Sequence, residues 1–466
     1  MKLVMKFGGS SLATTSRIKN AARIVQRYSK RNKILVVASA LDDVTDNLLE
    51  LGETAQRGGS AKAKSLLSNL QTLHSRIGRE VSARGAEKEL INRISELNLE
   101  LEKTVDGISH LRELSPRSRD YLLSFGERLS TLIVATALQN VGLKARALTG
   151  AEAGITTDEN FGEAKPLTEV SYHQIRQILE PSLSRKEIPV VTGFIGATVE
   201  GSITTLGRGG SDYTASLLGA ALDADEIWIW TDVDGLMTAD PRIVKESRVL
   251  SNVSFGEALE LSYFGAKMMH PRALQPAVQK RIPVRIKNSS KPSNEGTLVS
   301  ADEGNSSGRV VRAISIITSV GIVTVSGTGM MGAPGVAAKV FQTFGSNNIN
   351  VMMISQGSSE ATISCVIARK DIEKAVRALQ LALLGQGYVE KVAAERDACI
   401  IAVVGSGMKG TPGVAARIFR AVAQKKINVR MVAQGSSEYN VSFIVSEGRG
   451  PEAVRAIHEV FHLARP

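Results

Sequence analysis

The sequence predicts an α/β protein with an open, mostly parallel sheet sandwiched by helices, followed by two small α+β modules. Two observations carry this prediction. Over the first three hundred residues, short apolar runs such as ILVVAS alternate with helical patterns, as in sheets whose two faces are both covered by helices. The remaining residues contain an internal duplication, and each copy combines strand and helix patterns.

The first block is expected to contain several buried strands, because its apolar runs show no polar face. They are predicted over residues 2–7, 33–39, 188–192 and 226–231. Residues 60–115 interrupt the alternation. They are rich in Leu, Glu, Lys, Arg and Ala and have no obvious strand, so we expect a helical insertion. Ser115 and Pro116 then fit an N-cap and the first position of the next helix.

The polar, turn-rich stretch 291–309 predicts that a first domain covers residues 1–300. Downstream, VSGTGMMGAPGVAAKVF recurs as VVGSGMKGTPGVAARIF, and INVMMISQGSSE recurs as INVRMVAQGSSE, with a constant offset of 78 residues. We expect one module over 310–390 and a second over 395–466. The second copy ends without a final strand, whereas residues 313–317 add strand-forming sequence before the first. The two modules are therefore expected to be interleaved or to share a sheet.

The composition excludes several classes of protein. Two cysteines in 466 residues cannot form a disulfide framework, and no Cys/His cluster predicts a zinc site. The net charge of +11 comes from scattered basic residues, and aromatic residues make up only 4%, so we expect small anionic ligands and no nucleic acid. The N-terminal apolar stretch is too short for a signal peptide, and no uninterrupted apolar run reaches eighteen residues. A cytoplasmic protein without a membrane partner is expected.

Two glycine-rich turns carry candidate binding residues. Lys6 ends the first strand and precedes Gly8, Gly9 and Ser10, where backbone N–H groups and a cation suit phosphate. The same pattern also fits a plain strand-to-helix turn, and it is not a Walker A loop.

The second turn, TLGRGGSD, places Arg208 among glycines, where a fork of donors suits a carboxylate. Asp212 in this turn also fits a helix cap, and Glu127 in FGERLS also fits a solvated helix face. Two such turns at strand ends favour a shared phosphate-handling cleft.

Taken together, KFGGSS, FGERLS, TLGRGGSDYTA, WTDVDGLMTADPR, GAKMMHPR and the paired GVAA and QGSSE motifs resemble the aspartate kinase family over essentially the whole chain. The resemblance is to monofunctional members with the helical insertion, because the chain ends where bifunctional relatives continue. It implies the amino-acid-kinase fold followed by two ACT modules. The implied reaction transfers the γ-phosphoryl group of ATP to the side-chain carboxylate of L-aspartate, giving 4-phospho-L-aspartate, with Mg²⁺ accompanying ATP. This is the first step toward lysine, threonine and methionine.

The resemblance assigns catalytic roles to Lys6, which compensates charge on the transferred group, and to Asp212, which holds Lys6 and the glycine turns. Gly8, Gly9 and Ser10 would cradle phosphate. Arg208 would pair with an aspartate carboxylate, and Glu127 would receive the substrate ammonium. Other positions that match the substrate side are Ser39, Ala40, Thr45 and Ser211. Those that match the nucleotide side are Thr231, Asp232, Met237, Arg242, Lys267 and Met268; Met237 replaces a frequent tyrosine, so no aromatic contact is expected there.

The paired ACT modules imply allosteric inhibition by an end-product amino acid, with threonine as first choice and lysine next. The candidate effector positions, which also fit simple turn-building roles, are Gly335, Val336, Asn350 and Gln356 in the first copy and Gly413, Val414, Asn428 and Gln434 in the second. A homodimer or a dimer of dimers is expected. Two alternatives stay open: a related amino-acid kinase acting on another carboxylate or a carbamate, and an amino-acid sensor with a vestigial kinase domain.

Overall fold

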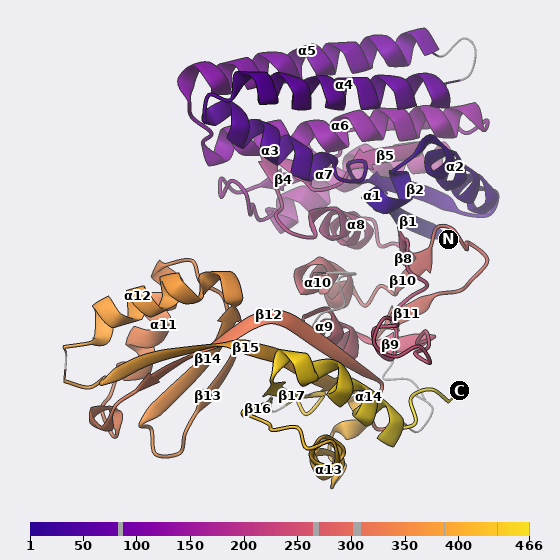
Figure 1. The fold of residues 1–466 in the computed structure, drawn as a ribbon. Coiled ribbons are helices and arrows are strands. Elements are labelled where there is room, and N and C mark those ends of the chain that lie inside the picture. The colour runs from indigo at the N-terminus through magenta and orange to yellow at the C-terminus, as the bar shows by residue number, and fades with distance from the viewer. Residues whose placement is uncertain (83–86, 264–269, 302–308, 386, 436, 466) are drawn as a thin grey trace. The chain divides into compact units, whose positions relative to one another are not determined.

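The computed structural model describes residues 1–82, 87–263, 270–301, 309–385, 387–435 and 437–465 (Figure 1). The chain divides into two compact units. Unit 1 comprises residues 1–236, 251–255 and 268–302, and unit 2 comprises residues 237–250, 256–267 and 303–466. Two stretches that precede residue 300 thus group with the tail. The boundary expected near residue 300 separates blocks of sequence, whereas the compact units cross it.

Unit 1 is built on a sheet that has eight strands in the described part of the chain. All neighbouring strands run parallel except β10 and β11, which are antiparallel. Their order across the sheet is β3 (Ala145–Leu148), β5 (Ile188–Thr192), β2 (Lys33–Ala38), β1 (Lys2–Phe7), β8 (Glu226–Thr231), β10 (Val284–Asn288), β11 (Thr297–Ser300) and β9 (Asn252–Ser254). The strands predicted from apolar runs are confirmed, with β2 one residue shorter than expected.

Helices cover both faces of this sheet, and the two-residue period of a strand decides which side chains meet which helices. Leu3, Met5 and Phe7 of β1 pack in one apolar cluster with residues of α2 (Thr15–Ser29) and α6 (Pro116–Asn140). Lys6 lies between them in sequence and therefore points to the opposite face. That face is covered by α7 (Thr168–Ser184) and α8 (Gly210–Ala221), and α10 (Pro271–Lys280) packs against α8.

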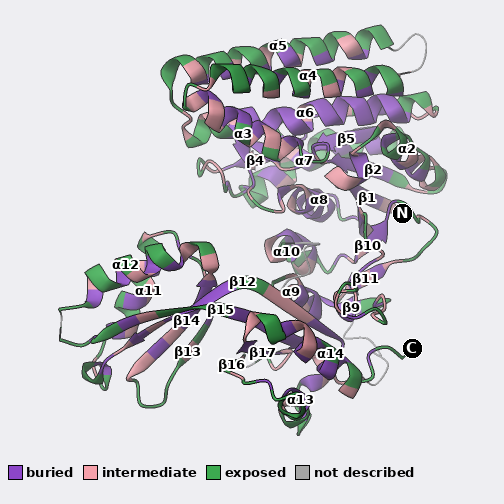
Figure 2. Ribbon diagram, viewed as in Figure 1, coloured by how far each residue is buried: buried purple, intermediate pink, exposed green. Residues whose placement is uncertain are grey.

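The expected helical insertion consists of α4 (Ser60–Val81) and α5 (Glu87–Leu111), which pack against each other and against α6. Figure 2 shows α6 buried over most of its length, while α4 and α5 keep exposed outer faces. Ser115 caps α6 by accepting the N–H of Ser118 at 3.2 Å, as its sequence predicts. The remaining elements of unit 1 are α1 (Gly9–Leu12), α3 (Val44–Gln56) and a small sheet of β4 (Thr156–Thr157), β6 (Ile195–Thr198) and β7 (Ile203–Thr205).

Unit 2 contains one antiparallel sheet to which both copies of the repeat contribute. In the described residues its order is β13 (Val351–Gln356), β14 (Thr362–Ala368), β12 (Ala313–Ser326), β15 (Lys391–Val404), β17 (Asn440–Val445) and β16 (Met431–Gln434). Its helices are α9 (Phe255–Tyr263, shared with unit 1 at Phe255), α11 (Val336–Ser346), α12 (Ile372–Leu383), α13 (Val414–Gln424) and α14 (Gly450–Val460), with short 3-10 turns η1 (Thr328–Met330), η2 (Arg369–Asp371), η3 (Ser406–Met408) and η4 (Glu447–Arg449).

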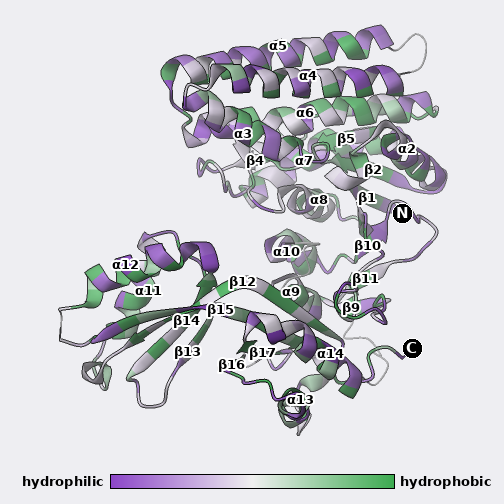
Figure 3. Ribbon diagram, viewed as in Figure 1, coloured by the Kyte–Doolittle hydropathy of each residue, from purple (hydrophilic) through white to green (hydrophobic). Residues whose placement is uncertain are grey.

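The two long central strands interleave the copies. The front of β12 pairs with the end of β15, where Ala313 lies opposite Val404 and Ile317 opposite Ile400. Ile314 accordingly packs in the apolar cluster of the second copy. Figure 3 shows β15 changing from hydrophilic to hydrophobic along its length, which follows its sequence KVAAERD–ACIIAVV.

Two stretches outside the repeat complete unit 2. Ala239 and Val244 pack in the same apolar cluster as Phe443 of the second copy.

Both cysteines, Cys365 and Cys399, are buried in the sheet as core residues. None of the helices in the described ranges combines the length and the apolar character needed to cross a bilayer.

Candidate active site

A cleft of about 670 Å³ lies in unit 1 beside the carboxyl ends of β1 and β2. Its walls come from the turns that follow these strands, from α6, and from the glycine-rich turn before α8. Of the residues selected from sequence, it is lined by Lys6, Gly9, Ser39, Ala40, Thr45, Glu127, Arg208, Ser211 and Asp212. Strand ends of an open parallel sheet are where such folds place ligands.

Lys6 and Asp212 form a buried ion pair in this cleft. The Lys6 Nζ lies 2.5 Å from Asp212 Oδ1, and each side chain is only about one tenth exposed (11% and 10%). Lys6 reaches this carboxylate because it points to the α8 face of the sheet, and Asp212 stands in the first turn of α8. The pair places a cation beside the cleft while a carboxylate fixes its position.

The first glycine turn leaves only part of its backbone available to a ligand. The N–H of Gly8 donates to the carbonyl of Trp230 at 3.2 Å. Gly9 and Ser10 are the first residues of α1, where N–H groups lack intrahelical acceptors. A side chain at Gly9 would place its Cβ 3.1 Å from the carbonyl oxygen of Ala40, so a glycine lets the two turns approach.

The second glycine turn carries Arg208 on a left-handed backbone. Gly207 and Gly209 have φ values of 74° and 72°, a region that favours glycine. A Cβ at Gly209 would also lie 2.7 Å from the Cβ of His270. The turn thus holds Arg208 in an exposed position at the cleft, where a fork of donors faces an incoming anion.

Glu127 is a buried carboxyl group on α6, with a relative exposure of 3%. Burial raises its pKa to about 8, although the N–H of Ala40 donates to it and Lys6 lies near it. Its Oε2 meets no hydrogen-bond donor among the described residues. The preceding Gly126 allows this approach, because a Cβ there would lie 2.9 Å from the Cβ of Ala40. The solvated-face interpretation of Glu127 is wrong, and its neighbour Arg128 instead binds Glu100 of α5 in two hydrogen bonds of 2.8 and 2.9 Å.

The cleft is also lined by residues to which the sequence assigns no role. Asp42 and Asp43 form an acidic pair in the turn after Ala40 and line it after β2. Asp46, the Gly162–Glu163 turn and Phe194 line it too and were not singled out. In the sequence, the local feature that could have pointed to Phe194 is the Gly193–Phe194 pair directly after strand β5. Its φ is 66°, and its N–H donates to Thr214 Oγ1 at 3.1 Å.

The residues selected for the nucleotide side are not brought together in this cleft. Thr231 and Asp232 stand at the end of β8 in unit 1, where Thr231 Oγ1 donates to Asp232 at 3.1 Å. Met237 and Arg242 belong to unit 2, and Arg242 pairs with Asp240 at 2.6 Å. Lys267 and Met268 lie outside the described residues.

The candidate effector positions occupy matching places in the two copies. Gly335 and Gly413 stand before α11 and α13 with φ values of 88° and 83°, so glycine is required there for the turn itself. Val336 and Val414 begin these helices and are buried. The polar positions, which are exposed in both copies, are Asn350, Gln356, Asn428 and Gln434.

Comparison with known proteins defines the class of this fold and site. The amino acid kinase family model matches residues 1–288, and the ACT domain model matches residues 323–383 and 401–461. The chain belongs to the amino acid kinase family and carries ACT domains in its tail.

Within this family the chain belongs to the aspartokinases. It is 35% identical over 465 residues to aspartokinase 1, chloroplastic, of Arabidopsis thaliana, covering 98% of this chain and 80% of that protein. The structure resembles E. coli aspartokinase III in complex with aspartate and ADP, with a TM-score of 0.83, 29% identity and 99% coverage of both chains. It also resembles the same enzyme in complex with lysine and aspartate, with a TM-score of 0.81, 29% identity and 98% coverage of both chains. The protein is thus a phosphotransferase whose acceptor is a carboxyl group.

Proposed function

We propose that this chain transfers the γ-phosphoryl group of ATP to the side-chain carboxylate of L-aspartate. The supporting observation is the cleft that joins the Lys6–Asp212 pair, the unpaired oxygen of Glu127 and the exposed guanidinium of Arg208. A free amino acid carries an ammonium and carboxylates, and these three features offer a partner to each. The cleft therefore favours an amino-acid acceptor over a carbamate.

In the proposed reaction, a side-chain carboxylate oxygen of aspartate attacks the γ-phosphorus, and the bond from that phosphorus to the bridging oxygen breaks to release ADP. Lys6 compensates the negative charge that develops on the transferred group. Gly9 and Ser10 offer backbone N–H donors beside it. Arg208 binds the α-carboxylate, and Glu127, once ionised, binds the ammonium. The other residues proposed to contact the substrate are Ser39, Ala40, Thr45 and Ser211.

Mg²⁺ is proposed to enter with the nucleotide, where it would neutralise charge on the phosphates. Oxygen donors suit this ion, which keeps several waters in protein sites. The carboxylates of Asp42 and Asp46 line the cleft and are the residues that would hold such waters.

The nucleotide side of the proposal rests on the motif match. Its residues are Thr231, Asp232, Met237, Arg242, Lys267 and Met268. The solved relative in complex with aspartate and ADP supports ATP as the donor. The cytoplasmic compartment expected from the low cysteine content stays a prediction, because the curated relative named above is a chloroplastic protein.

We further propose that an end-product amino acid inhibits the enzyme through the ACT domains, in a homodimer or a dimer of dimers. The sequence favours threonine as the effector. The relative solved with lysine supports testing lysine with equal weight. Because residues 237–250 pack into the tail, truncating the tail would also expose part of the chain before it. Single variants at Asn350 and Asn428 therefore test the effector site better.

The reaction is tested by an ATP-dependent hydroxamate assay with aspartate, glutamate and acetylglutamate as acceptors. We expect acyl phosphate from aspartate only. Threonine or lysine should lower the rate of aspartate phosphorylation. If the effector binds the first ACT copy, Asn350→Ala should weaken this inhibition; if it binds the second, Asn428→Ala should. Folded protein that phosphorylates no acceptor with Mg²⁺ and ATP present would instead support the sensor alternative.

A further inference from the structure

Asp120 is a fully buried carboxyl group on α6, with a relative exposure of 0%. It stands seven residues before Glu127, which is two turns of the same helix face. It does not line the cleft. A carboxyl group that is shielded from solvent needs hydrogen-bond donors from the protein. The donors to Asp120 therefore show which segments of the chain it anchors.

In the described part of the chain, the donors to Asp120 belong to Thr205 and Gly162, which both line the cleft. The Asp120 Oδ2 accepts the N–H of Thr205 at 2.7 Å and the N–H of Gly162 at 2.9 Å. Its Oδ1 accepts the Thr205 hydroxyl at 2.8 Å. Thr205 ends β7 three residues before Arg208, and both Thr205 and Gly162 line the cleft.

These two segments are also joined to each other by a backbone hydrogen bond. The N–H of Ala164 donates to the carbonyl of Thr205 at 2.9 Å. Arg272 of α10 donates from Nη2 to the carbonyl of Ala164 at 3.1 Å. The base of the Arg208 turn is therefore fixed between α6 and α10, and its tip, with left-handed glycines at 207 and 209, remains exposed.

We propose that Asp120 is a positioning residue that sets the separation between Arg208 and Glu127, and thereby the affinity for the amino-acid acceptor. One face of α6 carries Glu127 at the cleft and, two turns earlier, the anchor of the Arg208 turn. A ligand whose carboxylate binds Arg208 while its ammonium binds Glu127 requires that separation to be constant. This inference rests on the proposed function, because it uses the same two partners of aspartate.

The geometry requires acceptor atoms at Asp120, and it does not require a negative charge. Burial raises the pKa of this carboxyl group, and the bonds from Gly162 and Thr205 oppose the rise. An asparagine amide oxygen at the Oδ2 position would accept both N–H groups, and its NH₂ would donate to the Thr205 hydroxyl. Asn is therefore the conservative replacement, whereas Leu has similar size and no acceptor.

The test compares Asp120→Asn and Asp120→Leu in the full-length enzyme. We expect Asp120→Leu to raise the KM for aspartate at least tenfold while the KM for ATP stays within twofold. Asp120→Asn should keep the KM for aspartate within about threefold of the wild type. Thr205→Val, which removes one of the three contacts, should have an intermediate effect and keeps the proposal testable if the Leu variant does not fold.

Thr136→Val is the matched control. Thr136 is buried on the same helix, nine residues beyond Glu127, and its hydroxyl donates to the carbonyl of Leu132 at 3.0 Å, which is its one hydrogen-bond partner within the described ranges. We expect its KM for aspartate to be unchanged.

Three outcomes would overturn the inference: Leu and Val variants with wild-type KM for aspartate, an equal rise in both KM values, or an Asn variant as defective as the Leu variant. These outcomes can be distinguished from failure of the proposed function, because in that case the wild-type enzyme itself would phosphorylate no aspartate.

Discussion

The cleft of unit 1 and the shared sheet of unit 2 both contain ion pairs, but they place them in different surroundings. The Lys6–Asp212 side chains are about one tenth exposed, whereas those of Arg369 and Glu447, which start η2 and η4 beside the middle of β12, are about one third exposed (35% and 31%). Charges interact more strongly where water is excluded, and removing one partner leaves the other uncompensated. We therefore expect substitutions that remove a charge to have the largest effects in the cleft, and substitutions that disturb backbone packing to have the largest effects in the sheet.

The largest effect should follow from Lys6→Met. We expect kcat to fall about 10²–10³-fold, because a positioned charge at the transferred group is lost. Thermal stability should also fall, since Asp212 remains buried without its partner. The double variant with Asp212→Asn should recover stability without recovering kcat.

Lys2→Met is the control for this comparison. Lys2 lies on the same strand and donates to the carbonyl of Leu222 at 2.7 Å, remote from the cleft lining. Steady-state kinetics and thermal unfolding are measured for the wild type, Lys6→Met, the double variant and Lys2→Met. Together they separate an effect on catalysis from an effect on folding. A Lys6→Met enzyme with wild-type kcat would remove the proposed role of Lys6.

In the shared sheet, the largest effect should come from backbone packing at Gly321. A Cβ at this position of β12 would lie 2.7 Å from the carbonyl oxygen of Glu395 and against the side chain of Ile372. The second copy has the reverse arrangement, with Cys399 on the strand and Gly450 at the helix. Each copy thus pairs one small residue with one larger residue.

We expect Gly321→Ala to destabilise unit 2 by about 1–3 kcal/mol, as overpacking does. Hydrogen exchange of β12 and β15 amides in the whole enzyme measures the local opening free energy. Gly345→Ala in α11 is the control, because a Cβ there meets nothing within 4 Å, and it should stabilise the helix by about 0.5–1 kcal/mol. Equal protection in both variants would contradict the packing argument.

The pH dependence of aspartate binding should show an effect of intermediate size. With a pKa of about 8, Glu127 is mostly neutral at pH 7 in the free enzyme, and only its ionised form pairs with an ammonium. The KM for aspartate should therefore fall about fivefold as pH rises from 7 to 8, because the ionised fraction of Glu127 rises from about one tenth to about one half. Binding at pH 7 should release a proton, which calorimetry in buffers of different ionisation enthalpy detects. Glu127→Gln should raise the KM and abolish this pH dependence; a pH-independent KM in the wild type would show that Glu127 is already ionised.

The sequence predicted four of the strands of the unit 1 sheet and both glycine-rich turns, because apolar runs and glycine clusters act through neighbours close in the chain. It missed Asp120, since a carboxylate on a helix is usually solvated and its donors lie more than forty residues away. It also missed the packing of Ala239 and Val244 into the second copy, whose core residues lie about two hundred positions downstream. Contacts of that separation leave no local pattern.

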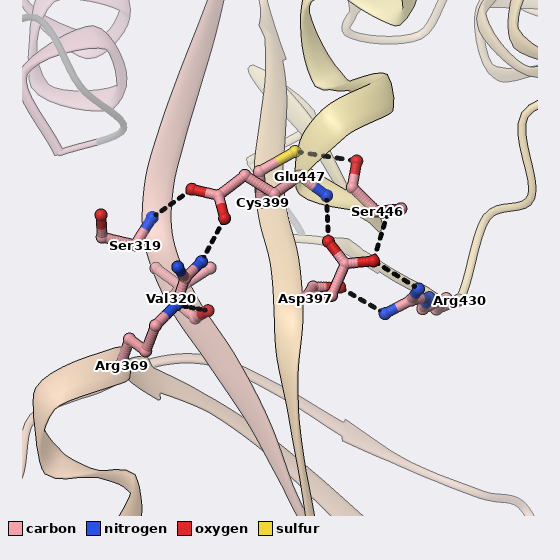
Figure 4. Close-up of polar contacts among 8 residues, drawn as sticks. All are labelled: Ser319, Val320, Arg369, Asp397, Cys399, Arg430, Ser446 and Glu447. Carbon is pink, nitrogen blue, oxygen red and sulfur yellow. Dashed lines mark hydrogen bonds and ion pairs between the residues drawn. The ribbon is translucent and has the colours of Figure 1, made fainter.

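The smallest effect is expected at the ion pair beside the middle of β12. Arg369 and Glu447 stand 78 positions apart, so they occupy equivalent sites in the two copies and form an ion pair across them (Figure 4). Arg369 holds the pKa of the Glu447 carboxyl below its usual value, and Glu447 also accepts the N–H of Ser319 at 3.2 Å.

A charge-reversal cycle tests whether this pair selects how the copies align. Arg369→Glu and Glu447→Arg each oppose like charges across the two copies, and the double reversal restores attraction. We expect a coupling of about 0.2–1 kcal/mol in the opening free energy of β12 and β15, because the pair is partly solvated. Salt should reduce it. The double reversal will not recover fully, since glutamate at position 369 cannot reproduce the contact that Ser319 makes with Glu447. A coupling of zero at low salt would show that the strands alone align the copies and that the duplicated charge positions contribute nothing to their pairing.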